Sequence, residues 1–134
     1  MAFVQVMNPN KSAETGAYSD GLIVDGWLYV SGQGPIDVTK GTAVAGTIEE
    51  EVRLTLNNMG DVLKAGGCTY ADVVRCTVHL INIEDFGRFN EVYKEFFKGV
   101  LPTRTTVQSM LGLGIKVEID CIARIPTAEV EYAS

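Results

Sequence analysis

One stretch alternates apolar and polar side chains with hardly a break: Lys116-Val-Glu-Ile-Asp-Cys-Ile-Ala-Arg-Ile125. Successive side chains of a β-strand point to opposite faces of a sheet, so a period of two predicts a strand with one apolar face. The apolar face carries Val117, Ile119, Cys121, Ala123 and Ile125, and the opposite face carries Glu118, Asp120, Ile122 and Arg124. We therefore expect a sheet that is covered on one side and presents charged groups on the other.

Further strands are predicted on both sides of this one. Residues 73–81 place Val74, Cys76, Val78 and Leu80 on one face, and Arg75, Thr77, His79 and Ile81 on the other. Apolar runs at 22–24 and 27–31 flank Asp25-Gly26, the dipeptide that a two-residue hairpin turn prefers. A strand at 103–110 is joined to the last one by a turn around Gly112 and Gly114. If all strands share the alternation, Arg104, Thr106 and Gln108 lie on the mixed face with Glu118 and Asp120.

Two helices complete the pattern. Thr47-Ile-Glu-Glu50 has the spacing of a capping box, and apolar side chains follow at helical intervals until Gly66-Gly67. The second helix begins near Asn82, buries an aromatic stripe and stops at Gly99; the stripe comprises Phe86, Phe89, Tyr93, Phe96 and Phe97. This order of elements favours one α+β domain over residues 1–134, with both helices on the apolar face of one mostly antiparallel sheet. Residues 129–134 are expected to fray.

Composition limits the classes of function. The chain has 134 residues, of which 46% are apolar, so it can bury the core of one domain. A net charge of -6 disfavours broad contact with a phosphate backbone, and nucleic acid is not an expected partner. No run approaches the roughly 20 apolar residues of a membrane span, and the first residues lack a signal-peptide pattern, so we expect a cytoplasmic protein without a membrane partner.

The three cysteines do not indicate a disulfide framework or a zinc site. They are odd in number and lack a Cys-x-x-Cys spacing. Cys76 and Cys121 fall on apolar strand faces and are expected to be inert core thiols. Cys68, in a turn, is the one expected to be most reactive, although nothing nearby supplies a base. No metal and no cofactor is predicted.

Arg104 is a permanent cation within a predicted strand and needs an anionic partner. An ordinary cross-strand pair with Glu118 or Asp120 would supply one. A bound carboxylate would supply it equally well, because the planar guanidinium can donate two parallel hydrogen bonds. The mixed face also includes Ile81 and Ile122, which are too apolar for a simply solvated surface. We infer that this face meets another subunit.

The chain resembles the Rid family of small trimeric proteins, also called the YjgF family, over nearly its whole length. The resemblance lies in the following segments: Gly16-Ala-Tyr18-Ser-Asp, Val30-Ser31-Gly32-Gln33-Gly-Pro35, Asn57-Asn-Met-Gly-Asp-Val-Leu, Val92-Tyr93-Lys-Glu-Phe-Phe97, Pro102-Thr-Arg104 and Val117-Glu118-Ile-Asp-Cys-Ile-Ala123. It implies a chorismate-mutase-like α+β protomer that forms a homotrimer, with sheets inward and a ligand cleft at each subunit interface.

The better studied members are enamine/imine deaminases, which implies hydrolysis of a 2-imino acid, or its enamine tautomer, to a 2-oxo acid and ammonia. The resemblance implies that Arg104 clamps the substrate carboxylate and that Glu118 manages water. It assigns Tyr18 and Ser31 to the cleft, and main-chain groups near Thr106 could hold the nitrogen end. Tyr18 and Ser31 could equally be structural residues, a packed ring and a tight strand end. His79, the only histidine, is interpreted as structural.

Four departures from the family pattern alter the expected pocket. Thr106 replaces a cysteine, Ala17 a proline and Gly34 a bulkier apolar residue, and the turn between Arg104 and Glu118 is one residue shorter. Other functions stay open: a non-catalytic module that binds small carboxylates or proteins, or a deaminase acting on an enamine of a different pathway. A ribonuclease is disfavoured by the acidic balance and by the absence of a paired His or Lys acid and base.

Overall fold

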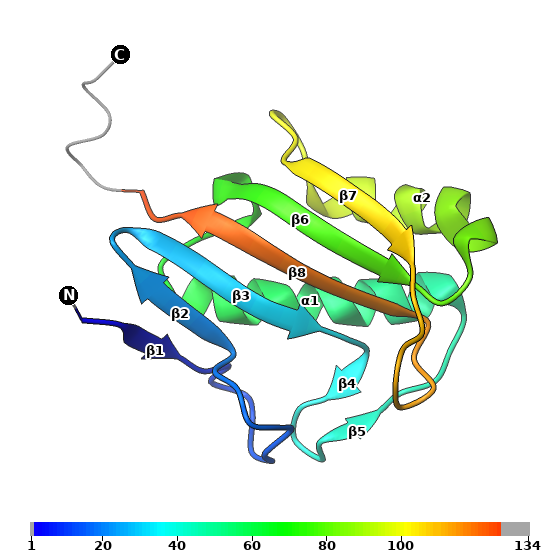
Figure 1. Ribbon diagram of the computed structural model, residues 1–134, viewed down its shortest axis with the longest axis horizontal. Helices are drawn as coiled ribbons and strands as arrows, with labels where there is room; N and C mark the ends of the chain where they lie inside the picture. The colour runs from blue at the N-terminus through cyan, green and yellow to red at the C-terminus, as the bar shows by residue number, and fades with distance from the viewer. Residues whose placement is uncertain (1, 127–134) are drawn as a thin grey trace.

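The computed structural model describes residues 2–126 and has the predicted α+β architecture (Figure 1). Six strands form one sheet in the order β1-β2-β3-β8-β6-β7, and helices α1 and α2 both lie on one face of it. The strands of this sheet are β1 (Val4–Val6), β2 (Gly21–Val24), β3 (Trp27–Gln33), β6 (Val73–Leu80), β7 (Thr103–Gln108) and β8 (Val117–Arg124). A small ribbon of β4 (Ile36–Asp37) and β5 (Thr42–Ala43) follows β3. The predicted fraying at 129–134 lies outside the described residues.

Both predicted helices are present, and the second ends at Phe96, three residues before the predicted end at Gly99. Helix α1 (Ile48–Ala65) begins at the capping box, where the Glu50 amide donates to the Thr47 hydroxyl at 3.2 Å and the Thr47 amide donates to the Glu50 carboxylate at 2.8 Å. Gly66 caps its C-terminus. Helix α2 (Phe86–Phe96) follows a 3₁₀ turn at Ile83–Asp85, which Asn82 caps through a hydrogen bond from the Glu84 amide.

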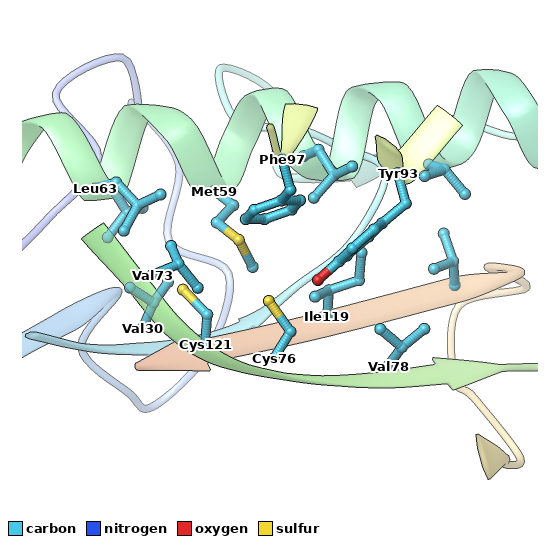
Figure 2. Packing of buried hydrophobic residues seen from close by; sticks show 14 of the residues in the cluster. Val30, Met59, Leu63, Val73, Cys76, Val78, Tyr93, Phe97, Ile119 and Cys121 are labelled. Carbon is cyan, nitrogen blue, oxygen red and sulfur yellow. The ribbon is translucent and has the colours of Figure 1, made fainter. Parts of the chain in front are cut away.

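The helices and the inner face of the sheet enclose one hydrophobic cluster (Figure 2). The predicted apolar face of β8 is confirmed, because its residues from Val117 to Ala123 are buried at every second position. Phe89, Tyr93 and Phe97 of the aromatic stripe are also buried. Phe86 is 39% exposed, so its predicted burial is wrong: it begins α2 beside β7, the edge strand, and no further strand of residues 2–126 lies beyond β7 to cover its ring.

A β-bulge corrects the predicted face of one strand. The register of β6 against β8 shifts between Val73 and Arg75. Val73 is therefore buried and Val74 is 40% exposed, the reverse of the predicted arrangement. From Cys76 onward the predicted alternation holds. A bulge adds one residue to one strand of a pair, which exchanges the faces of the side chains before it.

The predicted face of β7 is wrong for three residues. Strand β7 pairs with β6 in parallel, and Arg104 stands beside Cys76, whose side chain lies in the core. Neighbouring residues of paired strands share a face, so Arg104 points to the helix side, with Thr106 and Gln108 at every second position after it. Arg104 and Glu118 therefore lie on opposite faces of the sheet of one protomer.

Cys68 is not the reactive thiol that its turn position suggested. It is only 4% exposed, and burial raises its pKa to about 11, so the thiolate is scarce at neutral pH. Cys76 and Cys121 stand opposite each other on β6 and β8 and are buried and unbonded, as predicted.

Glu51 fastens the loop before β8 to the first turn of α1. Its side chain is 1% exposed and accepts hydrogen bonds from the Lys116 amide at 2.7 Å, the Lys116 ammonium at 2.9 Å and the Gly46 amide at 3.2 Å. Replacing Glu51 with Ala leaves the amides of Lys116 and Gly46 unpaired, and leaves the Lys116 ammonium with the Gly46 carbonyl as its acceptor but without a counter-charge. We therefore expect the free energy of unfolding to fall by about 2–4 kcal/mol. Chemical denaturation measures this fall. The matched variant Glu95→Ala removes an exposed partner of Arg53 and should change it by less than about 1 kcal/mol; equal effects would contradict the role of Glu51.

Candidate active site

Arg104 is held by aromatic rings. Its guanidinium carbon lies 5.4 Å from the ring centroid of Phe86, 5.3 Å from that of Phe89 and 4.8 Å from that of Tyr93. Each distance falls within the range of a cation–π contact, which contributes about 0.5–2 kcal/mol. Contacts with ring faces fix the plane of the guanidinium without occupying all the N–H donors at its edge.

Within residues 2–126, Arg104 makes no salt bridge with a carboxylate. The alternative interpretation, a structural pair with Glu118 or Asp120, is wrong, because β8 directs both of these carboxylates to the other face. The guanidinium thus keeps its charge available for an anion.

A groove of about 440 Å³ lies between α2 and β7, lined by Asn90, Tyr93, Lys94, Leu101, Pro102 and Arg104. Asn90 is a candidate that sequence reasoning missed. Its amide could donate or accept a hydrogen bond beside the guanidinium. The only signal in the sequence is its position three residues before Tyr93, on the side of α2 that meets β7.

Glu118 lies in a second pocket, on the other face of the sheet. This pocket has a volume of about 110 Å³ and is lined by Thr15, Tyr18, Gly32, Gly34, Ile36, Gly41, Leu113, Ile115 and Glu118. The carboxylate leans over β3: a Cβ atom built on Gly32 would stand 2.7 Å from Oε2 of Glu118 and 2.9 Å from its Cδ. Glycine at position 32 is therefore what leaves room for the carboxylate.

Two departures from the family pattern meet in the same pocket. A Cβ atom on Gly34 would stand 3.2 Å from Cδ1 of Ile115, so Ile115 fills from the β8 side the space that a side chain at position 34 would take. Leu113 lines the pocket from the loop between β7 and β8. This loop thus contributes two apolar side chains, those of Leu113 and Ile115, to the pocket wall.

Tyr18 lines this pocket together with Glu118. Its hydroxyl forms a hydrogen bond with that of Thr15, and its side chain is exposed by 44%. The Lys11 ammonium lies 5.1 Å from the ring centroid and is itself bound to Asp20 at 2.8 Å. The segment before β2 therefore presents the Tyr18 ring at the mouth of the pocket.

Ser31 ties β3 to the Tyr18 segment. Its hydroxyl donates to the Ser19 carbonyl at 2.6 Å, and its amide donates to the Asp20 carbonyl at 2.9 Å. It does not line the Glu118 pocket. Because the hydroxyl proton is already donated to the Ser19 carbonyl, a contact with substrate would have to use the lone pairs of the Ser31 oxygen. This contact stays a prediction.

Thr106 turns its hydroxyl inward. Its Oγ1 is buried and has no hydrogen-bond partner among the described residues. The predicted role in substrate binding therefore rests on the main chain of β7 rather than on this hydroxyl.

The predicted site residues thus form two groups. Arg104 and Thr106 lie on the edge strand, on the helix side, whereas Tyr18, Ser31 and Glu118 lie around β3 and β8. The sequence predicted one cluster. The structure of one chain brings Tyr18 and Glu118 together but leaves the cation elsewhere.

Outside both groups, His79 stands opposite Glu118 across β6 and β8, and its Nδ1 is within 2.8 Å of the Ser109 hydroxyl. Burial raises the pKa of Asp120, and the charges of His79 and Arg75 oppose this rise.

Among residues 2–126 no group of three or more His, Cys, Asp or Glu side chains could hold a metal ion. None of the helices in that range is long and apolar enough to span a membrane.

Comparison with known proteins identifies the family. Residues 9–125 match the family model described as Endoribonuclease L-PSP, which covers most of the chain. The chain belongs to this family, the Rid family named above. A Rid relative from Rattus norvegicus, named 2-iminobutanoate/2-iminopropanoate deaminase, is 44% identical over 121 residues, which cover 89% of this chain and 88% of the relative.

Solved structures of Rid relatives share the fold. A Yersinia pestis protein of the Rid family, YyfA, described as of unknown function, is 35% identical and superposes with a TM-score of 0.87 over 92% of this chain and all of its own. E. coli TdcF, solved with bound serine, is 30% identical and has a TM-score of 0.82 over 90% of this chain and 98% of its own. The predicted Rid membership and fold class are confirmed.

Proposed function

We propose that this protein hydrolyses 2-imino acids and their enamine tautomers, of the 2-iminopropanoate and 2-iminobutanoate class, to 2-oxo acids and ammonia. The curated relatives that carry the name of this activity are 42–44% identical to it over most of their length. The observation that carries the proposal is the guanidinium of Arg104, which is held on three aromatic rings and has no carboxylate partner among the described residues.

Arg104 would bind the substrate carboxylate through two parallel hydrogen bonds and so orient the C=N carbon. In the iminium form of the substrate the nitrogen carries two hydrogens. Glu118 would hold the attacking water and accept its proton as the C–O bond forms and the C=N π electrons become the nitrogen lone pair. The protonated Glu118 would return that proton to the nitrogen. Ammonia then leaves from the N-protonated carbinolamine as the O–H proton passes to Glu118 and the 2-oxo acid forms. Glu118 finally gives this proton to the released ammonia, which becomes ammonium, and regains its carboxylate. The anionic Glu118 also favours the cationic iminium, the more electrophilic form of the substrate.

The site is proposed to form between subunits of a homotrimer. In one protomer Arg104 and Glu118 lie on opposite faces of the sheet, and β7 is an edge strand. The site would be complete if the pocket of Tyr18 and Glu118 in a neighbouring subunit docked against the α2–β7 groove. Cyclic packing of identical chains repeats such a contact at each interface. A cytoplasmic location is part of this proposal and is tested by cell fractionation.

The test follows the loss of an imine. An amino-acid oxidase or a dehydratase generates 2-iminopropanoate or 2-iminobutanoate, and its decay is recorded with the wild type and with Arg104→Ala. We expect the wild type to accelerate decay, and Arg104→Ala to lower kcat/KM by about 100-fold or more, because the charged hydrogen bonds that orient the substrate are lost.

Decay at the same rate with both proteins would remove the catalytic proposal. Binding of a 2-oxo acid without turnover would then favour the non-catalytic carboxylate-binding module. Turnover of other enamines alone would favour a deaminase of a different pathway. Incubation with RNA serves as a parallel assay for the activity in the family description. We expect no cleavage, because the net charge of -6 opposes contact with a polyanion.

A further inference from the structure

Leu113 adopts a backbone conformation that leucine avoids. Its φ is +62°, and it lies between Gly112 and Gly114 in the loop between β7 and β8. The left-handed region costs a residue with a Cβ about 1–2 kcal/mol, and glycine adopts it freely. Leu113 is 78% exposed, so burial in the core of the protomer does not offset this cost.

The exposed side chain nevertheless lines the pocket of Glu118. Ile36 and Ile115 line it as well, whereas Glu118, Tyr18 and Thr15 provide its polar groups. The pocket therefore has a carboxylate and hydroxyl groups beside an apolar wall. Leu113 is the most exposed residue of that apolar wall.

The geometry of the substrate assigns this wall a role. The imine carbon is trigonal and carries a carboxylate, a nitrogen and a side chain. In the proposed reaction the carboxylate goes to Arg104 and the carbon faces the water on Glu118. The side chain is the remaining substituent, and an aliphatic group is placed most favourably against apolar surface.

We propose that Leu113 is a specificity-determining residue that contacts the side chain of the 2-imino acid and favours aliphatic chains longer than a methyl group. This inference rests on the proposed function, and it concerns which imino acids are selected. Leu113 would act through the apolar area it covers, because its side chain has no group that could take part in proton transfer.

The experiment compares imines of increasing chain length, prepared with an amino-acid oxidase from alanine, 2-aminobutyrate and norvaline. For the wild type we expect kcat/KM to rise by about fourfold for each added methylene, the ratio that corresponds to the transfer of one buried CH₂. Leu113→Ala and Leu113→Gly should flatten this series, so that kcat/KM falls most for the imine of norvaline and least for 2-iminopropanoate. Leu113→Gly also relieves the backbone strain, so its Tm should not fall.

Met110→Ala is the matched control, because Met110 lies in the same loop, is 96% exposed and does not line the Glu118 pocket. It should keep the wild-type series. If the wild type is active and the series keeps its slope in both Leu113 variants, the inference is overturned. A uniform drop for all three imines together with a lower oligomer mass overturns it too, because Leu113 would then pack between subunits.

Failure of the proposed function gives a different result. If the wild type accelerates no imine, titration calorimetry with pyruvate, 2-oxobutanoate and 2-oxopentanoate decides the role of Leu113 by itself. A gain in affinity with chain length that Leu113→Ala removes supports the contact. The inference is overturned if the affinity of the wild type and that of Leu113→Ala depend equally on chain length. It is also overturned if neither protein binds any of the three 2-oxo acids.

Discussion

A mixture of two inactive variants should be active. We expect Arg104→Ala and Glu118→Gln to be inactive alone, and to recover about a quarter of the wild-type activity when equal amounts are refolded together. In the proposed cyclic trimer each site would take Arg104 from one subunit and Glu118 from the next. When the two variants assemble at random, Arg104 is intact at a given site with a probability of one half, and so is Glu118. About a quarter of the sites therefore contain both residues.

The physical basis of this expectation is the separation seen in one chain. Arg104 points to the helix side of β7, and Glu118 leans over β3 on the other face. Side chains on opposite faces of a sheet cannot contact the same small substrate at the same time. A site within one protomer would need a rearrangement of β7 that disrupts its pairing with β6.

A mixture of Arg104→Ala with the double variant Arg104→Ala, Glu118→Gln is the matched control, since no assembly of these chains contains an intact Arg104. It should stay inactive. Native mass spectrometry confirms that subunits have mixed. Mixed trimers with no recovered activity would show that Arg104 and Glu118 do not meet across an interface.

The sequence was informative where one face of an element is uniformly apolar. Strand β8 is buried at every second residue, and α1 begins at its capping box, so local pattern and tertiary packing agree there. The bulge in β6 left no such signal, because Val73 and Val74 are both apolar and either could face the core. The extra residue of the bulge places Val73 in the core and Val74 toward solvent.

The faces of β7 were predicted wrongly for a related reason. From Thr103 to Gln108 it carries polar side chains on both faces, so its alternation does not identify the inner one. Arg104 lies on the helix side of β7, where its guanidinium stacks on the rings of α2, a contact between distant parts of the chain that no local pattern predicts. The resemblance to the family supplied the candidate site residues, and the register of β7 shows that they lie in two groups on opposite faces of the sheet.

Gly32→Ala should lower kcat/KM by about 30- to 100-fold without unfolding the protein. The added Cβ would stand 2.7 Å from Oε2 of Glu118, closer than real Cβ contacts, so the carboxylate must move. A displacement of about 1 Å at a catalytic group can reduce the rate by about 100-fold. The backbone of Gly32 is not in the left-handed region, so alanine adds no strain of its own. Kinetics on 2-iminobutanoate and thermal unfolding measure the two effects separately.

A double-mutant cycle identifies the cause. If the methyl group added by Gly32→Ala acts by moving the carboxylate, this substitution should have little further effect in the Glu118→Gln background, because the group that it displaces is already disabled. Gly87→Ala controls for the substitution itself, since a Cβ there meets nothing within 4 Å. Full additivity of Gly32→Ala and Glu118→Gln would mean that Gly32 serves the reaction by another route, such as a direct approach of substrate to its main chain.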